Sequence, residues 1–334
     1  MLLLISASVA DGGWVYTHTK GGESDAKAQK ATWPALCRSG RFQSPIDIDT
    51  SKVSETPGLS GGVVPAFSGA HLIANNTGHN FQISFEKGEK PAHTMLRGET
   101  FDFVQAHFHV PSEHTIDGER AAMEGHFVHT LRGSDPPVLA VVGIFFSETN
   151  ECNPILELFW DAFKIDGIGA AKQPTDPVDL TALLTPAYAD GYYHYTGSLT
   201  TPPCTEGVDW NLAKGALGVC GAQLQRLKTG LAATQNGVDI NNRAINPLNL
   251  RDVTTTSTQL AAAFAVTPTS LLGPFDSGSK AVASSRTVWF LPALGLVIAA
   301  GGFLAYRRGG SSRKGSRSDP LLEAREVDTR YAHA

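Results

Sequence analysis

The chain has 334 residues, of which 42% are hydrophobic and 18% are charged, and its formal net charge is −5. This composition supports a sizeable buried core and excludes a disordered chain, while the mild, dispersed negative charge argues against nucleic-acid binding. The 34 glycines and 19 prolines favour many short strands and turns over a bundle of helices.

The first ten residues are the first recognisable segment. Residues 1–10 contain a short apolar run that ends in Ser-Val-Ala, which resembles a signal-peptidase site, although a basic start is missing. We expect a signal peptide or its remnant here, the alternative being the frayed start of the folded domain.

Alternating apolar and polar residues then predict a β-rich domain at residues 11–262. In chain order we expect a turn into a strand at 42–49, two strands or one bulged strand at 71–85, strands at 100–110 and 124–131, a doubly buried strand at 138–146, a helix at 153–165, a strand–turn–strand region at 192–210 and a helix at 221–231. The predicted fold class is therefore mainly β (α+β), as a single domain with a few short helices.

The residues from 263 onward predict a membrane anchor. A stalk rich in Thr, Ser and Ala at 263–286 leads to residues 287–306, twenty residues without a charge, which as a helix would span roughly 30 Å of hydrocarbon. Arg307 and Arg308 follow directly, as expected on the cytoplasmic side. A buried core helix would need a domain around it, whereas only a polar tail follows at 307–334. We expect a single-pass type I membrane protein whose large domain is extracellular or lumenal.

The four cysteines are Cys37, Cys152, Cys204 and Cys220, and no two of them form a CxxC pair. Four cysteines allow three pairings, and their spacing does not choose among them. Because the expected compartment is oxidising, we expect a disulfide among them.

A histidine cluster at residues 105–129 predicts a metal site. His107 and His109 are two residues apart on a predicted strand, so their side chains project from the same face. If the next strand pairs beside it antiparallel, His126 joins them. Three neutral imidazoles with an open fourth position are typical of a catalytic zinc site. The alternative is three separate histidines that bond to backbone or water.

Two polar residues strengthen the interpretation as a zinc site. Gln105 and Glu124 stand two residues before His107 and His126, on the same strand faces. A zinc-binding imidazole needs an acceptor for its other N–H group, and both residues are placed to provide one. Taken alone, either residue could equally lie on a solvated strand face.

These motifs together resemble the α-class carbonic anhydrases. The runs HFH, SEHTIDG and AAMEGHFVH, with QSPIDI upstream and SLTTPPCTEGVDW downstream, occur in the family's order over about residues 14–251. The resemblance implies a large twisted, mostly antiparallel sheet with Zn²⁺ at the base of a conical cleft. It also implies reversible hydration of CO₂ to bicarbonate by attack of zinc hydroxide. Within the family, HFHVPSEH is similar to the short-loop bacterial, plant and algal members, with Val110 in place of a tryptophan.

The resemblance also implies roles for individual residues. His107, His109 and His126 match the zinc ligands, Thr200 matches the threonine that accepts the proton of the hydroxide, and Glu113 matches the carboxylate that orients this threonine. His79 matches the histidine that passes protons to buffer. The residues that match the wall receiving CO₂ are Val128, Val141, Leu199, Thr201, Val208 and Trp210.

The same resemblance pairs Cys37 with Cys204, which lie beside QSPIDI and TTPP as in secreted and membrane-bound members, and gives no partner to Cys152 or Cys220. Two further functions are compatible with these motifs. One is a catalytically silent binding or adhesion module, which the presence of all three histidines argues against. The other is zinc-dependent ester hydrolysis as a side activity. The expected partners are CO₂ or bicarbonate and the membrane.

Overall fold

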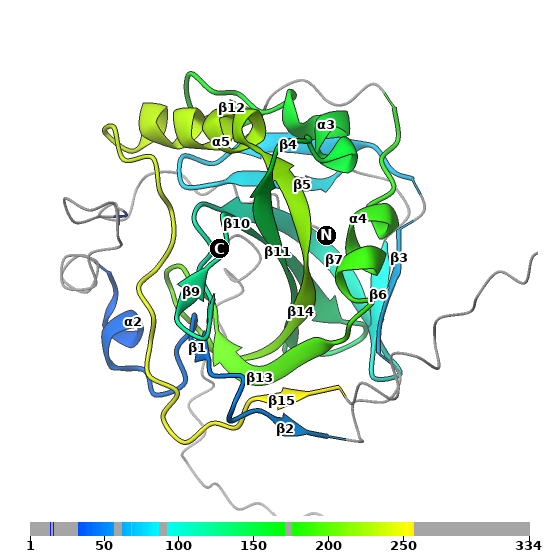
Figure 1. Cartoon of the computed structure of the whole chain (residues 1–334), viewed down its shortest axis with the longest axis vertical. Coiled ribbons are helices and arrows are strands. Elements are labelled where there is room, and N and C mark those ends of the chain that lie inside the picture. The colour runs from blue at the N-terminus through cyan, green and yellow to red at the C-terminus, as the bar shows by residue number, and fades with distance from the viewer. Residues whose placement is uncertain are drawn as a thin grey trace, which may run out of the picture. The chain divides into compact units, whose positions relative to one another are not determined.

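The computed structural model describes residues 14, 16, 33–56, 62–67, 69–86, 92–170 and 176–256. A 12-stranded sheet with the order β12-β4-β5-β7-β10-β11-β14-β13-β15-β2 forms most of this part, and β3 and β6 add a hairpin against β7 (Figure 1). Its strands are β2 (Ser54–Glu55), β3 (Val63–Ala66), β4 (Leu72–Asn76), β5 (Phe81–Phe85), β6 (His93–Leu96), β7 (Glu99–His109), β10 (Met123–Leu131), β11 (Leu139–Thr149), β12 (Gly169–Ala170), β13 (Tyr192–Ser198), β14 (Glu206–Cys220) and β15 (Thr254–Thr255).

The remaining elements are short. A small sheet combines β1 (Asp47–Ile48), β8 (Thr115–Ile116) and β9 (Glu119–Arg120). The helices of the described residues are α2 (Ala35–Ser39), α3 (Pro154–Trp160), α4 (Thr181–Ala187) and α5 (Gly221–Thr234). The predicted mainly β domain with a few short helices is therefore confirmed.

The sheet is mixed, although most of its pairings are antiparallel as expected. At its centre β11 runs parallel to β14, and at its edge β15 runs parallel to β2. The predicted double burial of β11 is confirmed, because seven consecutive residues from Ala140 to Phe146 are buried. Gly143 permits the close approach of β14, since a Cβ at this position would lie 2.5 Å from Leu212 Cδ2.

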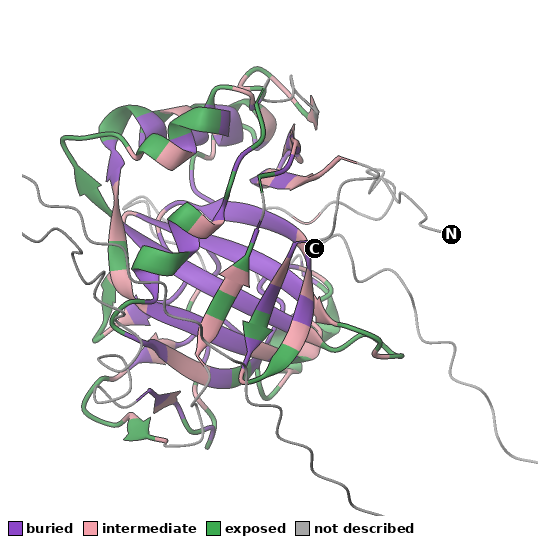
Figure 2. Ribbon diagram, turned by 90° about the vertical axis from the view of Figure 1, so that its right-hand side faces the viewer, coloured by how far each residue is buried: buried purple, intermediate pink, exposed green. Residues whose placement is uncertain are grey.

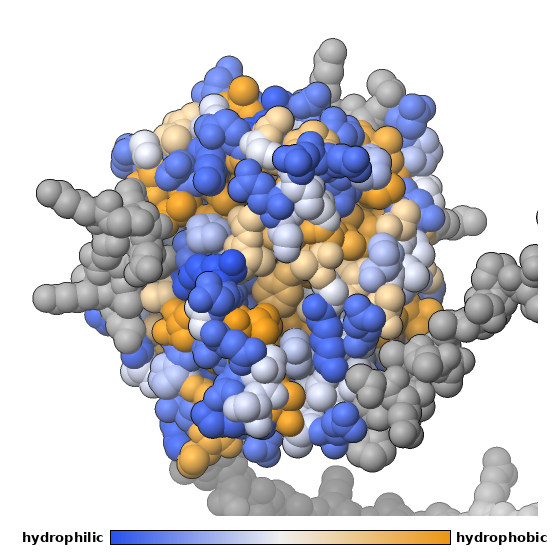
Figure 3. Space-filling view, in the orientation of Figure 1, coloured by the Kyte–Doolittle hydropathy of each residue, from blue (hydrophilic) through white to orange (hydrophobic). Residues whose placement is uncertain are grey.

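The two faces of the sheet carry different apolar clusters. Phe127 of β10 belongs to the larger cluster, which also contains the buried residues of α3, α4 and α5, whereas its neighbour Val128 belongs to a second cluster with Val141 and Trp210. Figure 2 shows the buried strands as a purple layer, with exposed residues mainly on helices and hairpin ends. In Figure 3 hydrophilic residues surround a central apolar area over β11 and β14. Helices α3, α4 and α5 thus pack on one face of the sheet and leave the other for the polar site described below.

Helix α3 is shorter than the predicted 153–165. The Asn153 side chain caps its start by accepting hydrogen bonds from the backbone N–H groups of Ile155 and Leu156. At the other end, Arg226 of α5 donates to the carbonyl groups of Trp160, Asp161 and Phe163. The helix therefore ends five residues early because a side chain satisfies carbonyls that further helical turns would have used.

Several predictions concern residues outside the described part of the chain. The signal segment at 1–10, the stalk at 263–286, the apolar segment at 287–306 and the tail at 307–334 all lie there. Among the described residues, no helix is both long and apolar enough to cross a membrane.

All four cysteines form disulfides. Cys37 pairs with Cys204, as the resemblance implied, and Cys152 pairs with Cys220, for which the sequence offered no partner. The second pair is explained by the sheet, because β11 and β14 run side by side to their ends, where Thr149 lies opposite Cys220.

Replacement of Cys152 and Cys220 together by serine is expected to lower the free energy of unfolding by about 2–4 kcal/mol, because the cross-link restricts the unfolded chain. The bond closes a segment of 68 residues. Cys220 is also the N-cap of α5, and serine preserves this cap. Urea unfolding measures the difference. An unfolding free energy equal to that of the parent chain would contradict the prediction.

Candidate metal centre

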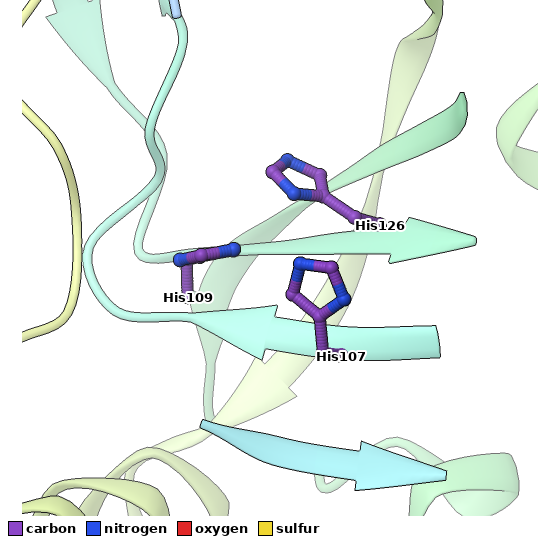
Figure 4. A group of neighbouring side chains, drawn as sticks. All are labelled: His107, His109 and His126. Atoms are coloured by element: carbon purple, nitrogen blue, oxygen red, sulfur yellow. The ribbon is translucent and has the colours of Figure 1, made fainter. Parts of the chain in front are cut away.

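Three imidazoles converge on one face of the sheet. In the antiparallel register of β7 and β10, His126 lies directly opposite His107, and His109 follows two residues along β7. Figure 4 shows the three rings turned toward a common point, two from β7 and one from β10. One ring nitrogen of each histidine lies within 4.8 Å of the others, and all three side chains are buried. The period-2 argument made from the sequence therefore predicted that His107 and His109 share a face, and the antiparallel pairing that it assumed places His126 beside them.

The second nitrogen of each ring is held by an acceptor. Gln105 Oε1 lies 2.8 Å from His107 Nδ1, and Glu124 Oε1 lies 2.8 Å from His126 Nε2, as the sequence predicted. The third acceptor, the carbonyl oxygen of Asn241 at 2.8 Å from His109 Nδ1, was not predicted. These acceptors fix the tautomers, so that the lone pairs of His107 Nε2, His109 Nε2 and His126 Nδ1 face the common point.

A buried network extends from His126 through Glu124. Glu124 Oε1 also accepts from His114 Nδ1 at 2.7 Å, and Glu124 Oε2 accepts from the backbone N–H groups of Glu113 and His114, each at 2.8 Å. His114 Nε2 continues to the Tyr195 hydroxyl at 2.6 Å. Four hydrogen bonds thus fix one carboxylate and, through it, the orientation of His126.

The electrostatics of the centre favour the neutral forms of His107 and His109 and the ionised form of Glu124. Burial, reinforced by repulsion from His109 and His126, holds the pKa of His107 well below its usual value. Burial likewise lowers the pKa of His109. Burial alone would raise the pKa of Glu124, but His114 and His126 outweigh it and hold this pKa well below the usual range. Neutral imidazoles are the form that binds a metal ion.

The residues present fit a zinc ion. Three imidazole nitrogens with an open side toward a cavity match the ligand set of catalytic zinc sites. His109 Nε2 is buried and has no hydrogen-bond partner among the described residues, a costly state for a polar atom. A metal bond at this atom would remove the cost, and we conclude that the three histidines could hold Zn²⁺.

Glu113 and Thr200 both lie at the centre, but they do not make the hydrogen bond expected from the resemblance. Glu113 Oε1 accepts from the backbone N–H of Arg243 at 2.8 Å, while Oε2 has no hydrogen-bond partner among the described residues. Oε2 instead lies 3.5 Å from His109 Nε2 and 3.9 Å from His126 Nδ1. In this arrangement Oε2 lies beside two ring nitrogens that present lone pairs, so neither nitrogen donates a hydrogen bond to it.

A cavity opens beside the histidines, and Thr200 is part of its wall. Its lining contains five of the six predicted substrate-pocket residues, Val128, Val141, Leu199, Thr201 and Trp210, together with His107, His126 and Thr200. Val208 is the exception. It is buried in the same apolar cluster as Val128, Val141 and Trp210, so it packs within the wall and not on its surface.

His79 lies away from this lining, in the turn between β4 and β5. Its carbonyl oxygen accepts a hydrogen bond of 2.9 Å from Asn241 Nδ2, and the backbone of Asn241 holds His109. One asparagine therefore connects the turn that carries His79 to a candidate zinc ligand.

The sequence analysis missed a buried arginine that supports the site. Arg243 donates from its backbone to Glu113, and its guanidinium donates to the carbonyl groups of Ser44 and Cys37. Burial lowers the pKa of Arg243 to about 10. It ties the Cys37–Cys204 disulfide region to Glu113, and no local pattern around residue 243 indicates this contact.

Comparisons with known proteins agree with the geometry. Residues 27–257 match the family model described as eukaryotic-type carbonic anhydrase, a range that includes every helix and strand of the described residues. The chain is similar to a carbonic anhydrase of Neisseria gonorrhoeae, with 34% identity over 218 residues, 65% of this chain and 79% of that protein. It is also similar to a solved α-carbonic anhydrase from Thermovibrio ammonificans in complex with the inhibitor sulfanilamide (TM-score 0.60, 30% identity, 73% of this chain and 99% of that chain). A second similar structure is a carbonic anhydrase from Chlamydomonas reinhardtii in complex with acetazolamide (TM-score 0.59, 29% identity, 73% and 100%).

Proposed function

Since the chain belongs to the eukaryotic-type, α-class carbonic anhydrase family, whose members catalyse reversible hydration of CO₂, we propose that it does so with a zinc ion held by His107, His109 and His126. The observation that carries the proposal is the convergence of three imidazole nitrogens whose other nitrogens are fixed by acceptors. The HFHVPSEH run supports the further proposal that the chain is one of the short-loop members of the family.

Zinc in such a site supplies a Lewis acid that lowers the pKa of water to about 7 and so provides a nucleophile at neutral pH. The chain provides the surroundings. Gln105, Asn241 and Glu124 keep the three ligands in the tautomers that present lone pairs. Each is therefore needed for the metal affinity and not only for the packing.

The substrate meets the cavity wall. Val128, Val141, Leu199 and Trp210 offer apolar surface to uncharged CO₂ and exclude water from it. Thr200 lies in the same wall, where its hydroxyl oxygen can accept a hydrogen bond from the O–H group of the nucleophile and thereby direct the lone pair of the nucleophile. For this, Glu113 must accept a hydrogen bond from the threonine hydroxyl, which needs Oε2 to turn from the imidazole edges toward Thr200. His79 passes the released proton to buffer.

Replacement of Thr200 by valine is expected to lower kcat/KM for CO₂ hydration by about 10²-fold, comparable to loss of one oriented hydrogen bond at a reacting oxygen. Zinc content should not change, because Thr200 is not a ligand. Thr201→Val, a change of the same size in the same wall, is the matched control and should cost less. Equal losses for the two variants would show that Thr200 has no orienting role.

The test of the proposed function is a joint measurement of zinc content and stopped-flow CO₂ hydration on the purified full chain. We expect about one zinc ion per chain and loss of activity on chelation, with recovery when zinc is returned. A chain without zinc, or with zinc and no hydration, would rule the function out.

We also propose that residues 287–306 anchor the enzyme as a type I membrane protein with the catalytic domain outside the cytosol. The proposal is supported by the length of the uncharged run and by the arginines that follow it. Alkaline extraction of membranes should leave the chain in the pellet. Protease added outside should remove the catalytic domain and spare a tag on the tail. A chain that alkaline buffer releases is not anchored by this segment.

A further inference from the structure

The end of helix α5 and the segment after it hold the turn that carries His79. Thr234 Oγ1 donates to the Gly78 carbonyl at 2.9 Å, and Asn241 Nδ2 donates to the His79 carbonyl at 2.9 Å. The backbone of His79 is thus fixed on both sides by residues more than 150 positions away. Its side chain has fewer constraints, and they come from two aromatic rings and one amide.

The imidazole of His79 stacks on Trp14, with ring centroids 4.0 Å apart and an interplanar angle of 19°. Tyr16 meets the same ring edge-on at 6.4 Å. The Nδ1 atom of His79 is buried, and within the described residues it makes no hydrogen bond of normal geometry. Trp14 therefore stacks on the imidazole and Tyr16 contacts it edge-on, while the polar edge at Nδ1 has no fixed partner among the described residues.

Gln235 provides the matching group. It directly follows α5, is only 5% exposed, and neither amide atom makes a hydrogen bond of normal geometry in the part of the chain that the structure describes. Its side chain nevertheless lies close enough to His79 to favour the protonated imidazole. Unpaired buried polar atoms on two neighbouring side chains are costly, and a small rotation of either group would pair them.

We propose that Gln235 is a positioning residue for proton transfer, holding the imidazole of His79 through Nδ1 so that Nε2 remains free to exchange protons. The proposal rests on the role of His79 in the proposed function. A glutamine suits this task because its amide can accept from a protonated Nδ1 or donate to an unprotonated one. It can therefore hold the ring in both states of the cycle.

Among the groups around the turn, the side chain at position 235 should have the most direct effect on the pKa of His79. Burial lowers the pKa of His79, and the Gln235 side chain opposes this shift. Among the described residues, the groups that face the imidazole are Trp14, Tyr16 and Gln235, and no carboxylate of this part of the chain contributes to the shift. A change of charge at position 235 should therefore move the titration of His79 directly.

The experiment compares Gln235→Leu and Gln235→Glu in the full chain loaded with zinc. At low buffer concentration kcat depends on the fraction of unprotonated His79, so it rises with pH through the pKa of this residue. We expect the midpoint to rise by about one pH unit in Gln235→Glu and to fall by a few tenths in Gln235→Leu. Gln235→Leu should also lower kcat at low buffer roughly threefold or more, while kcat/KM and the rate at high buffer stay unchanged.

Two controls separate positioning from a general structural effect. Gln225, exposed on the same helix, is the matched site, and Gln225→Glu should leave the profile as in the parent chain. In a His79→Ala background, both changes at Gln235 should have no effect on kcat at low buffer. A loss of the same size in this background, or midpoints that do not move in opposite directions, would overturn the proposal.

Failure of the underlying function gives a different result. If His79→Ala alone keeps full kcat at low buffer, His79 is not the proton relay and the inference falls with it. If Gln235→Glu does not fold, the Gln235→Leu profile and an NMR titration of the His79 ring protons decide, since an unchanged titration in Gln235→Leu would show that the amide does not act on the ring.

Discussion

Replacement of His109 by alanine is expected to abolish zinc binding and CO₂ hydration together. The His109 side chain is fully buried, and its Nε2 atom has no hydrogen-bond partner within the described residues. Alanine would remove one of the three ligands and open a space beside Glu113. The two imidazoles that remain are not enough for a catalytic zinc site. We expect zinc to fall from about one ion per chain to nearly none and kcat/KM to fall by roughly 10³-fold or more.

Elemental analysis and stopped-flow hydration measure the two effects on the same preparation. His93→Ala is the matched control, because this histidine lies on β6 and is not one of the three candidate ligands. It should keep both zinc and activity. A His109→Ala chain that retained zinc and most of its activity would show that the three histidines do not form the catalytic centre.

The candidate ligands could be predicted from the sequence because they depend on local geometry. His107, His109 and their acceptor Gln105 lie on one strand, and a period of two places their side chains on one face whatever the sheet around them. Glu124 and His126 follow the same rule on β10. The pairing of these two strands could not be predicted from the residues and was assumed. The structure shows this pairing, with His126 opposite His107.

Contacts between distant segments carried no such signal. The acceptor for His109 is a backbone carbonyl 132 residues away, and every residue type has a carbonyl, so residue identity could not point to Asn241. Thr200 and Glu113 were assigned from the resemblance alone, and the structure brings both to the centre without the expected hydrogen bond between them. Val208 was assigned to the pocket by the same route and is packed within its wall.

For the fold, too, local patterns could be predicted from the sequence, whereas the pairing of distant segments could not. Alternation located β7 and β10, and a near-continuous apolar run located β11, but neither pattern has a direction, so the parallel pairing of β11 with β14 could not be predicted. That pairing is also what brings Cys152 and Cys220 together. Helix α4, of only seven residues with a proline at position 186, is too short for a helical period to emerge.

Glu124→Gln is expected to weaken zinc binding by roughly 10–100-fold and to lower the free energy of unfolding of the metal-free chain by about 3–5 kcal/mol. The carboxylate accepts four hydrogen bonds, two on each oxygen, from His114, His126 and the backbone of Glu113. Glutamine has almost the same shape, but one of these oxygens becomes an N–H₂ group that faces two donors. The loss is therefore one of hydrogen bonding and not of volume.

The two possible amide orientations have different costs. If the N–H₂ group faces the backbone, two buried backbone donors lose their acceptor, which lowers stability. If it faces the histidines, His126 must accept at Nε2 and carry its proton on Nδ1, the atom turned toward the metal position, so zinc binding is lost. Competition with a chromogenic chelator measures zinc affinity, and urea unfolding measures stability. Glu119→Gln, an exposed position on β9, is the control. If Glu124→Gln matched this control in both measurements, the carboxylate would not be what orients His126.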